Sequence, residues 1–512
     1  MALGFGHLLR NVAPSGPGRE GAPGRRSEAL VTQHSSAGRS PRHAAESSQS
    51  FPPHPLPRSA PRGIRWSAAT AAFQIEGART ADGRGRSIWD DYVDTPGLVK
   101  DGSTAEPGPD SYHRFAEDIA LARGLGLDRY RFGISWVRVL PDGSGAVNQA
   151  GLDYYSRLVD GLLEAGVTPF PTLYHWDLPV SIEASGGWLD RDTAMRFRDY
   201  AEVVAAHLGD RVHNWYTINE PAMTTLQGYG VGTLAPGRTE LFGALPSAHH
   251  QLLAHAITAP MLREESAAAA QAAGTLQAQV GLTNNHTFVM PLANTQEDAM
   301  AAYAYDLVHN RLFADPLLTG SYPDVEALGL PPMPVQPGDL ELIRGSVDFY
   351  AVNFYNPTTV TAASPDSPLP FDIVPTPGAP VTGFGEEWPI VPESLTALLV
   401  DFKERYGDAL PPLVIGENGA SYPEPDTVPP GETIDDAERI DYLSGHISAV
   451  ADAIEAGVVI EEYTAWSLID NFEWADGFTQ RFGLVHVDTQ SGERTPKASY
   501  DWYRQVIESS RA

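Results

Sequence analysis

Cysteine is absent from the 512-residue chain, which excludes disulfide bonds, a thiolate nucleophile and zinc or iron–sulfur sites with cysteine ligands. Long apolar runs are absent as well, because no stretch reaches the roughly 18 apolar residues that a membrane helix needs. The segment Met1–Arg10 has a short apolar part followed by proline, glycine and arginine, which is not typical of a secretory signal peptide. We therefore expect a cytoplasmic protein that spans no membrane.

Positive charge is scarce. The chain has 35 lysine and arginine residues against 65 aspartate and glutamate residues, a net charge of −30 at pH 7. So acidic a chain repels nucleic acid and anionic lipid unless it carries a concentrated basic patch, and the main body has none. Nucleic acid and membrane surfaces are therefore not expected partners. Hydrophobic residues make up 42% of the chain, which is typical of a globular enzyme with a large core.

The first 62 residues differ from the rest. They contain eight arginines and no lysine against three glutamates and no aspartate, a local charge of +5. The segment is rich in serine, proline, glycine and alanine and has no apolar period, which is typical of disorder. We predict a disordered extension over residues 1–62 and one folded domain over residues 63–512. The extension is either a basic targeting arm or a dispensable tail.

From Gly63 onward, short β-rich runs alternate with helical patterns, which predicts an α/β fold. The eight runs are Arg65–Thr70, Asp128–Trp136, Val167–Trp176, Val212–Glu220, Gln277–His286, Val347–Tyr355, Pro412–Glu417 and Glu462–Leu468. The helix candidates lie near Tyr112–Gly124, Gly151–Ala165, Arg191–Leu208, Leu245–Ala273, Thr295–Phe313, Pro392–Arg405, Ile434–Ala456 and Lys497–Ser509. Eight strands, each followed by a helix, indicate a (β/α)8 TIM barrel. A doubly wound sheet is the alternative, but its dinucleotide-binding form is disfavoured because no Gly-x-Gly-x-x-Gly follows the first run.

Two connections are long, namely Thr361–Pro392, which holds eight prolines, and Ser421–Thr433. In a barrel both lie on the carboxyl-end face, where substrates bind. Long irregular loops at that face are more often functional than idle. We therefore expect both connections to border the site.

Polar and aromatic residues gather where the proposed strands end. Glu220 ends the fourth run and Glu417 ends the seventh, each beside an asparagine. One carboxylate just past a buried strand could be structural, since burial is costly unless the group is partnered. Two such groups on opposite sides of a barrel can flank one bond, which suits glycoside hydrolysis. The tryptophans and tyrosines at the strand ends agree, because sugars stack on aromatic rings, although core packing remains the alternative for any single ring.

With these residues in view, the chain strongly resembles the family 1 glycoside hydrolases, the β-glucosidase type, from about Arg65 to Tyr503. The matching motifs occur in the family's order and are Ala69–Gly77 (ATAAFQIEG), Tyr130–Trp136 (YRFGISW), Thr217–Pro221 (TINEP), Glu417–Gly419 (ENG) and Trp466–Trp474 (WSLIDNFEW). The resemblance implies a barrel that catalyses a retaining double displacement without cofactor or metal. It implies that Glu220 is the general acid/base and that Glu417 is the nucleophile.

The resemblance also implies roles for the residues around this pair. Arg131 and Tyr355 would lie beside Glu417 and keep it ionised, because a guanidinium and a phenol hydrogen bond lower the pKa of a carboxylate. Trp466 would form the platform under the sugar ring. The other implied substrate-binding residues are Gln74, His175, Trp176, Asn219, Asn353, Tyr355, Glu473, Trp474 and Phe482.

Glu473 bears on the choice of substrate. A carboxylate at this place accepts hydrogen bonds from the hydroxyls at sugar carbons 4 and 6, and it repels a 6-phosphate. We therefore predict a retaining β-glucosidase that releases terminal β-D-glucosyl residues from unphosphorylated β-glucosides and short oligosaccharides.

Two positions depart from the family pattern, namely Gly416 in place of the usual threonine and Ser67 in place of the usual glycine. A glycine beside the nucleophile has more backbone freedom and neither a β-branch nor a hydroxyl. We expect Glu417 to be held less firmly, and Gly416→Thr to raise the rate or the thermal stability provided that φ at residue 416 is negative.

Three alternatives remain beside this interpretation. The first is a non-catalytic sugar-binding or scaffold protein on the same barrel, which the presence of both Glu220 and Glu417 disfavours. The second is a related enzyme such as a β-galactosidase, β-fucosidase or transglycosylase. The third is a metal enzyme using His249, His250 and His255, but the spacing does not place these side chains on one helix face. The sequence indicates no oligomeric state.

Overall fold

The computed structural model describes residues 54–512 except residues 276, 366 and 368. Its centre is a closed barrel of parallel strands in the order β1-β13-β12-β7-β5-β4-β3-β2. These strands are β1 Arg65–Ala69, β2 Arg129–Gly133, β3 Thr168–Tyr174, β4 Asn214–Asn219, β5 Gln279–Asn285, β7 Phe349–Asn353, β12 Leu413–Asn418 and β13 Ile460–Trp466. The predicted (β/α)8 barrel is confirmed, and the doubly wound alternative is wrong because the sheet closes on itself.

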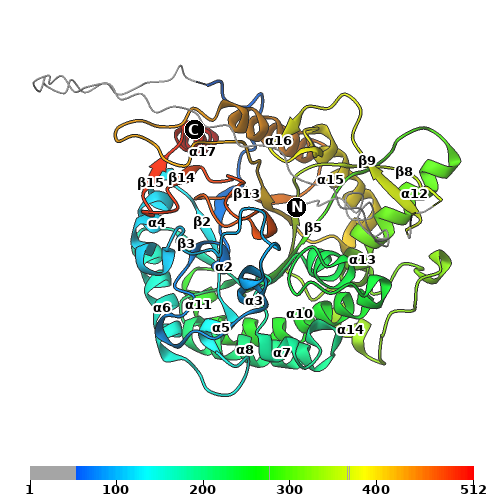
Figure 1. Cartoon of the computed structure of the whole chain (residues 1–512), viewed down its shortest axis with the longest axis horizontal. Helices are drawn as coiled ribbons and strands as arrows, with labels where there is room; N and C mark the ends of the chain where they lie inside the picture. Colours follow the sequence, from blue (N-terminus) through cyan, green and yellow to red (C-terminus); the bar gives the residue numbers. More distant parts are fainter. Residues whose placement is uncertain (1–53, 276, 366, 368) are drawn as a thin grey trace, which may run out of the picture.

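Helices surround the barrel (Figure 1), and their sequence spacing explains which face packs inward. The helix α6, for example, buries Leu152, Tyr155, Val159 and Leu162, which recur at intervals of three or four residues. The longer helices are α4 Ser111–Leu125, α6 Gln149–Glu164, α8 Asp192–Leu208, α10 Leu245–Glu265, α12 Gln296–Asp306, α13 Leu312–Thr319, α15 Glu393–Tyr406, α16 Ala437–Glu455 and α17 Ala498–Arg511. The shorter ones are α2 Ala72–Ile75, α3 Ile88–Asp94, α5 Trp136–Val139, α7 Val180–Glu183, α9 Pro221–Met223, α11 Ala267–Ala272 and α14 Asp339–Ile343.

Each predicted strand overlaps one barrel strand, whereas two helix predictions and one loop prediction need correction. The candidate Leu245–Ala273 is divided at Ser266 into α10 and α11. The candidate Thr295–Phe313 continues through a π-helical stretch, Leu307–Arg311, to the end of α13. The connection Thr361–Pro392 is not irregular throughout, because it contains short strands. The strands outside the barrel are β6 Val289–Pro291, β8 Thr358–Ala362, β9 Phe371–Val374, β10 Val381–Thr382, β11 Gly385–Pro389, β14 Val485–Val487 and β15 Arg494–Pro496.

Residues 54–62, which the sequence places in the extension, contact the barrel's outer helices instead. The indole nitrogen of Trp502 donates a hydrogen bond of 2.9 Å to the carbonyl of Pro55. Arg58 lies 2.5 Å from Asp452 and His54 lies 3.1 Å from Asp435. Two prolines in this short stretch are buried, and proline packing has no period that a sequence pattern reveals. Residues 1–53 of the predicted extension lie outside the described residues.

The strand β2 places two arginines inside the barrel. Arg129 and Arg131 are two residues apart, so they point to the same face of the strand. The Arg129 guanidinium lies 4.8 Å from the ring centre of Phe170, and that of Arg131 lies 4.6 Å from the ring centre of Tyr216. These two rings pack with Phe349, Ala351 and Val414 into one buried cluster. The lumen is therefore a packed core, as expected for a TIM barrel, with one guanidinium toward each end.

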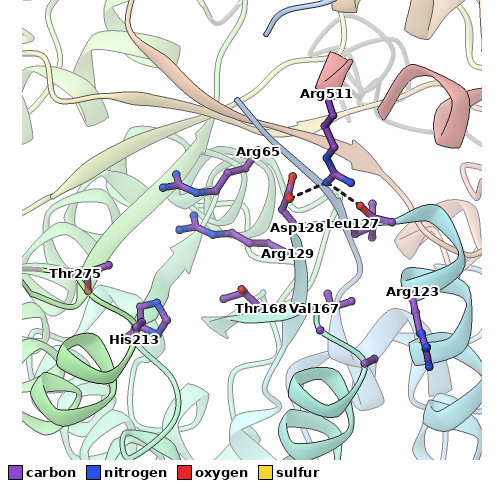
Figure 2. A pocket seen from close by; sticks show the side chains of 14 residues that line it. Arg65, Arg123, Leu127, Asp128, Arg129, Val167, Thr168, His213, Thr275 and Arg511 are labelled. Carbon is purple, nitrogen blue, oxygen red and sulfur yellow. Dashed lines mark hydrogen bonds and ion pairs between the residues drawn. The ribbon is translucent and has the colours of Figure 1, made fainter. Parts of the chain in front are cut away.

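The amino-terminal ends of the strands border a hollow that holds several arginines (Figure 2). Three of them are in ion pairs, namely Arg65 with Glu461, Arg129 with Glu462 and Arg511 with Asp128. Arg511 also donates to the carbonyl of Gly126, which ends α4. Since helix carboxyl ends carry partial negative charge, the contact of Arg511 with the end of α4 is favourable.

Within residues 54–512, apart from the three omitted positions, no helix has the length and apolar character required to cross a bilayer.

Candidate active site

The carboxyl ends of β4 and β12 bring Glu220 and Glu417 to one cavity. Glu220 follows β4 and precedes Pro221, which begins α9. Its backbone N–H donates to the carbonyl of Thr283 at 2.9 Å, so the residue is fixed to β5 by its main chain. Glu220 has a positive φ of 48°, as do Trp176 with 78° and Trp474 with 51°, and all three line the cavity. Left-handed backbone at non-glycine residues concentrates at functional sites.

Glu417 lies in a cationic and hydrogen-bonded environment. The Arg131 guanidinium donates to its Oε1 at 2.7 Å and to the carbonyl of Gly416 at 2.9 Å. The Tyr355 hydroxyl donates to Oε2 at 2.6 Å. Each carboxylate oxygen of Glu417 therefore has its own donor, one of them a charged guanidinium. Arg131 and Tyr355 are thus the neighbours of Glu417 that the resemblance implies.

The donors to the Glu220 side chain among the described residues are amides rather than cations. Its Oε1 accepts hydrogen bonds from Asn353 Nδ2 at 2.8 Å and Asn285 Nδ2 at 3.3 Å. Burial, together with the negative charge of Glu417, raises the pKa of Glu220 to about 7. A raised pKa on one of the two carboxyl groups is expected of the acid in an acid–nucleophile pair.

The cavity is lined by aromatic rings and acids. The His175 and Trp466 rings stack with centres 5.9 Å apart, and Trp176 lies 4.7 Å from Trp474. Burial raises the pKa of Glu473 well above its usual range. The lining residues are His175, Trp176, Glu220, Tyr355, Trp388, Glu417, Trp466, Glu473, Trp474 and Phe482.

Four residues predicted from the sequence lie behind this lining and hydrogen-bond to residues in it. They are Gln74, Arg131, Asn219 and Asn353. Gln74 donates to Glu473 Oε2 at 3.2 Å. Asn219 contacts His175 Nε2 at 3.0 Å through its Nδ2, while its Oδ1 accepts from Arg131 at 2.6 Å and from Asn353 at 3.1 Å. Gln74 Oε1 and His175 Nδ1 are buried without a hydrogen-bond partner in the described chain. Buried polar atoms normally have partners, so these two atoms are suited to a polar ligand.

Comparison with known proteins identifies the family. The family model described as Glycosyl hydrolase family 1 matches residues 57–512. The chain belongs to glycosyl hydrolase family 1. The resemblance stated from the sequence motifs is therefore confirmed over nearly the whole described chain.

The similarity to individual members of the family extends over most of this chain and over nearly all of each relative. It is 40% identical over 454 residues to the 1,4-beta-D-glucan glucohydrolase of Thermotoga neapolitana, covering 88% of this chain and 98% of that one. It is 41% identical to a bifunctional beta-D-glucosidase/beta-D-fucosidase of Bifidobacterium breve, covering 87% of this chain and 98% of that protein. The family 1 b-glucosidase structure from Thermotoga maritima matches with a TM-score of 0.81 at 38% identity, covering 89% of this chain and all of that chain.

Two residues of this candidate site, Trp388 and Asn285, were not predicted from the sequence. Trp388 lines the cavity and stacks on Phe384 with ring centres 4.3 Å apart. It lies inside the long connection that was expected to border the site, and a tryptophan in such a loop was the available signal. Asn285 ends β5 and contacts Glu220. The strand-end argument that singled out Glu220 applied to Asn285 equally, but it was not extended to the fifth run.

The structure points to another role for Gly416 than the backbone freedom expected from the sequence. The φ angle of Gly416 is not positive, so the glycine is not needed for its backbone freedom. A Cβ atom built there would lie 2.7 Å from Asn353 Oδ1 and 2.9 Å from Thr283 Oγ1, closer than such atoms approach. The glycine therefore makes room for two polar side chains, and a threonine would displace them.

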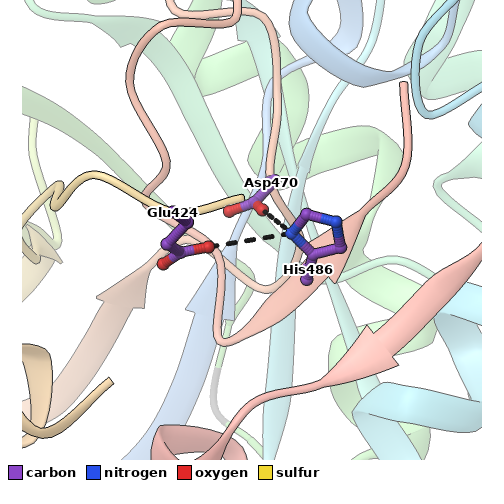
Figure 3. A group of neighbouring side chains, drawn as sticks. All are labelled: Glu424, Asp470 and His486. Carbon is purple, nitrogen blue, oxygen red and sulfur yellow. Dashed lines mark ion pairs between the residues drawn. The ribbon is translucent and has the colours of Figure 1, made fainter. Parts of the chain in front are cut away.

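One group of side chains outside the cavity has the composition of a metal site (Figure 3), consisting of Glu424, Asp470 and His486. Lys497 already lies 2.6 Å from Glu424 and 2.9 Å from Asp470. Arg439 contacts Glu424 as well. Because these buried cations already balance the two carboxylates, the group is a salt-bridge network rather than a vacant ligand set.

The three histidines considered as metal ligands are directed to different partners. His249 contacts Asp339 at 2.8 Å, His250 contacts the Trp188 carbonyl at 2.9 Å, and His255 contacts Thr217 at 2.7 Å. They are packing residues of α10, as the spacing predicts.

Proposed function

We propose that this protein is a retaining β-glucosidase in which Glu417 is the nucleophile and Glu220 is the general acid/base. The asymmetry of the two carboxyl groups carries the proposal. Both carboxyl groups are buried, but Glu417 accepts from a guanidinium and a phenol, whereas the donors to Glu220 among the described residues are amides. The names of the relatives, which include β-glucosidases of two bacterial genera, support the same activity.

The geometry supports a two-step reaction. Ionised Glu417 attacks the anomeric carbon while Glu220 protonates the leaving oxygen, which gives a glycosyl ester on Glu417. The ester no longer carries a charge, so one of the two influences that raise the pKa of Glu220 is removed. Glu220, which has given up its proton, is therefore more stable as a carboxylate and takes a proton from the incoming water, which attacks the anomeric carbon and releases Glu417. The mutual electrostatic effect thus changes the role of Glu220 between the two steps.

The sugar contacts follow from the lining. Gln74 Oε1, His175 Nδ1 and the Glu473 carboxyl are buried polar groups available to hydroxyls. Trp466, which also lines the cavity, offers an aromatic face to the ring. No lysine or arginine is among the described lining residues, so a sugar phosphate would be buried without a cation. The preference for unphosphorylated glucosides therefore rests on the missing cation as much as on Glu473.

Hydrolysis of aryl β-glycosides tests the proposal. We expect 4-nitrophenyl β-glucoside to be cleaved with a β-configured sugar as the first product in NMR, and its 6-phosphate to be a poor substrate. The galactoside and fucoside belong in the same series, since one relative is named for two activities. An α-configured first product would refute the retaining mechanism. A 2-fluoro glucoside should label Glu417 in peptide mass spectrometry, and a label on Glu220 would reverse the two roles.

A further inference from the structure

The two amides on Glu220 Oε1 control how well its ionised form is stabilised. Asn353 and Asn285 each present an N–H group to the same oxygen. An amide that turned over would present its oxygen instead, which repels a carboxylate. Burial and Glu417 raise the pKa of Glu220, whereas these two hydrogen bonds lower it. The orientation of the amides therefore decides part of the acid–base balance.

Each amide is held in this orientation by a third residue. The Thr283 hydroxyl donates to Asn353 Oδ1 at 2.7 Å. His309 Nε2 lies 3.1 Å from Asn285 Oδ1, and burial lowers the pKa of His309 to about 3. The histidine is therefore neutral near pH 7, and the contact with an oxygen requires its proton to be on Nε2. The Tyr305 hydroxyl lies 3.5 Å from Nδ1, on the side where the neutral ring has its acceptor.

Gly416 leaves the space that this arrangement needs. The two atoms that a Cβ would meet there, Asn353 Oδ1 and Thr283 Oγ1, are the two ends of one hydrogen bond. Any side chain at residue 416 would therefore press on that bond. The residue next to the nucleophile thus bears on the orientation of the acid/base.

We propose that Thr283 and His309 are positioning residues that fix the two amides on Glu220, and that Gly416 provides the space in which Thr283 acts. The inference rests on the proposed function, because it assigns to Glu220 the proton transfers of that reaction. Neither residue lines the described cavity, so neither contacts the sugar. Among the described residues, Glu417, Glu473 and Tyr355 interact electrostatically with Glu220, and the substitutions below leave all three in place.

The test compares Thr283→Val with Thr283→Ser in the full-length enzyme. Valine keeps the shape of threonine but cannot donate, so Asn353 keeps only its contact with Asn219 Oδ1 to orient it, and its hydrogen bond to the ionised form of Glu220 is weakened. We expect the alkaline limb of kcat/KM, which reports loss of the acid proton, to move up by about half a unit to one unit. With a 2,4-dinitrophenyl β-glucoside, whose leaving group needs little protonation, kcat should fall about 3- to 10-fold because the base step is impaired. Serine keeps the hydroxyl, so Thr283→Ser should have the alkaline limb and the kcat of the wild type.

His309→Phe tests the second amide and serves if the valine variant does not fold. Phenylalanine retains the ring stacked on Tyr305, whose centre lies 5.2 Å away, but has no N–H. In this variant the alkaline limb of kcat/KM should also move up, but by less than in Thr283→Val, because the Asn285 contact with Glu220 is longer than that of Asn353. Unshifted alkaline limbs in the folded variants would refute the inference while leaving the β-glucosidase activity intact. A wild-type enzyme that cleaves no β-glucoside would instead refute the proposed function.

Discussion

Two arginines of β2 each form an ion pair with a glutamate of another barrel strand, and the two pairs lie at opposite ends of the barrel. At the amino-terminal end, Arg129 contacts Glu462 at 2.8 Å and Asn214 at 3.0 Å. At the carboxyl-terminal end, Arg131 contacts Glu417 at 2.7 Å. Both pairs are buried, and both guanidinia lie close to an aromatic ring.

The two pairs differ in whether the glutamate lines a cavity. Glu462 borders no described cavity, while Glu417 lines one. Glu417 also has a second carboxyl group, Glu220, within electrostatic range. An ion pair inside a barrel is therefore structural or catalytic according to its exposure to a ligand, and not according to its own geometry. This agrees with the general division of TIM barrels into a stabilising face and a reactive face.

Replacing Glu417 should produce the largest change. Glu417→Ala removes the nucleophile, so no glycosyl ester forms and kcat should fall by at least about 10⁴-fold. The measurement is the steady-state rate on 4-nitrophenyl β-glucoside, with thermal melting as the folding control. A variant that keeps a tenth of the wild-type rate would contradict the catalytic role of this pair.

Glu220→Gln should rank second. The amide is nearly isosteric but carries no transferable proton, so the rate should fall by about 10²–10⁴-fold. Substrates with good leaving groups should lose less in the first step. The alkaline limb, expected near the pKa of about 7, should disappear from the pH profile of kcat/KM. Persistence of that limb in the folded variant would assign it to another group.

Gly416→Thr should harm the enzyme, contrary to the expectation from sequence alone. The added Cβ would displace Asn353 or Thr283, and a misplacement of about 1 Å at a catalytic group can cost about 10²-fold. The measurement is kcat together with the melting temperature, and Gly416→Ala provides the smaller perturbation. A threonine variant that is faster than the wild type would show that Asn353 and Thr283 can move without harm to catalysis.

Glu462→Gln is the matched change at the other end of the barrel. It removes the charge partner of buried Arg129, which typically costs about 3–5 kcal/mol of stability. Because this end borders no active-site cavity, kcat of the folded protein at 25 °C should change less than about 3-fold. The measurements are urea unfolding and kcat on the same preparation. A large loss of kcat with unchanged stability would overturn the division between the two ends.

Deleting residues 1–62 should have the smallest effect, confined to stability. The deletion removes the carbonyl of Pro55, which accepts from the buried Trp502 indole, and an unpaired buried donor costs about 1–3 kcal/mol. We expect melting to fall by about 2–4 °C relative to a chain beginning at His54, with kcat unchanged. Identical melting of the two chains would show that the contacts of residues 54–62 contribute nothing.

Much of this protein followed from its sequence because the information was local or periodic. Alternating apolar runs and helical patterns predicted the barrel. The motifs around Glu220 and Glu417 predicted the pair, because a charged residue directly after a buried strand is conspicuous in one dimension. Arg131 and Trp474 were likewise predicted from motifs that are contiguous in the chain.

The tertiary structure decided what depends on residues distant in sequence. Gly416, Thr283 and Asn353 lie on three different strands, so the space that the glycine provides exists only when β5, β7 and β12 are side by side. Trp388 reaches the cavity through a connection whose path no periodicity describes. The protonation of Glu220 depends on burial and on a charge that is distant along the chain. Sequence fixes which groups are present and which way each strand faces, whereas distance, desolvation and available volume arise only when the barrel closes.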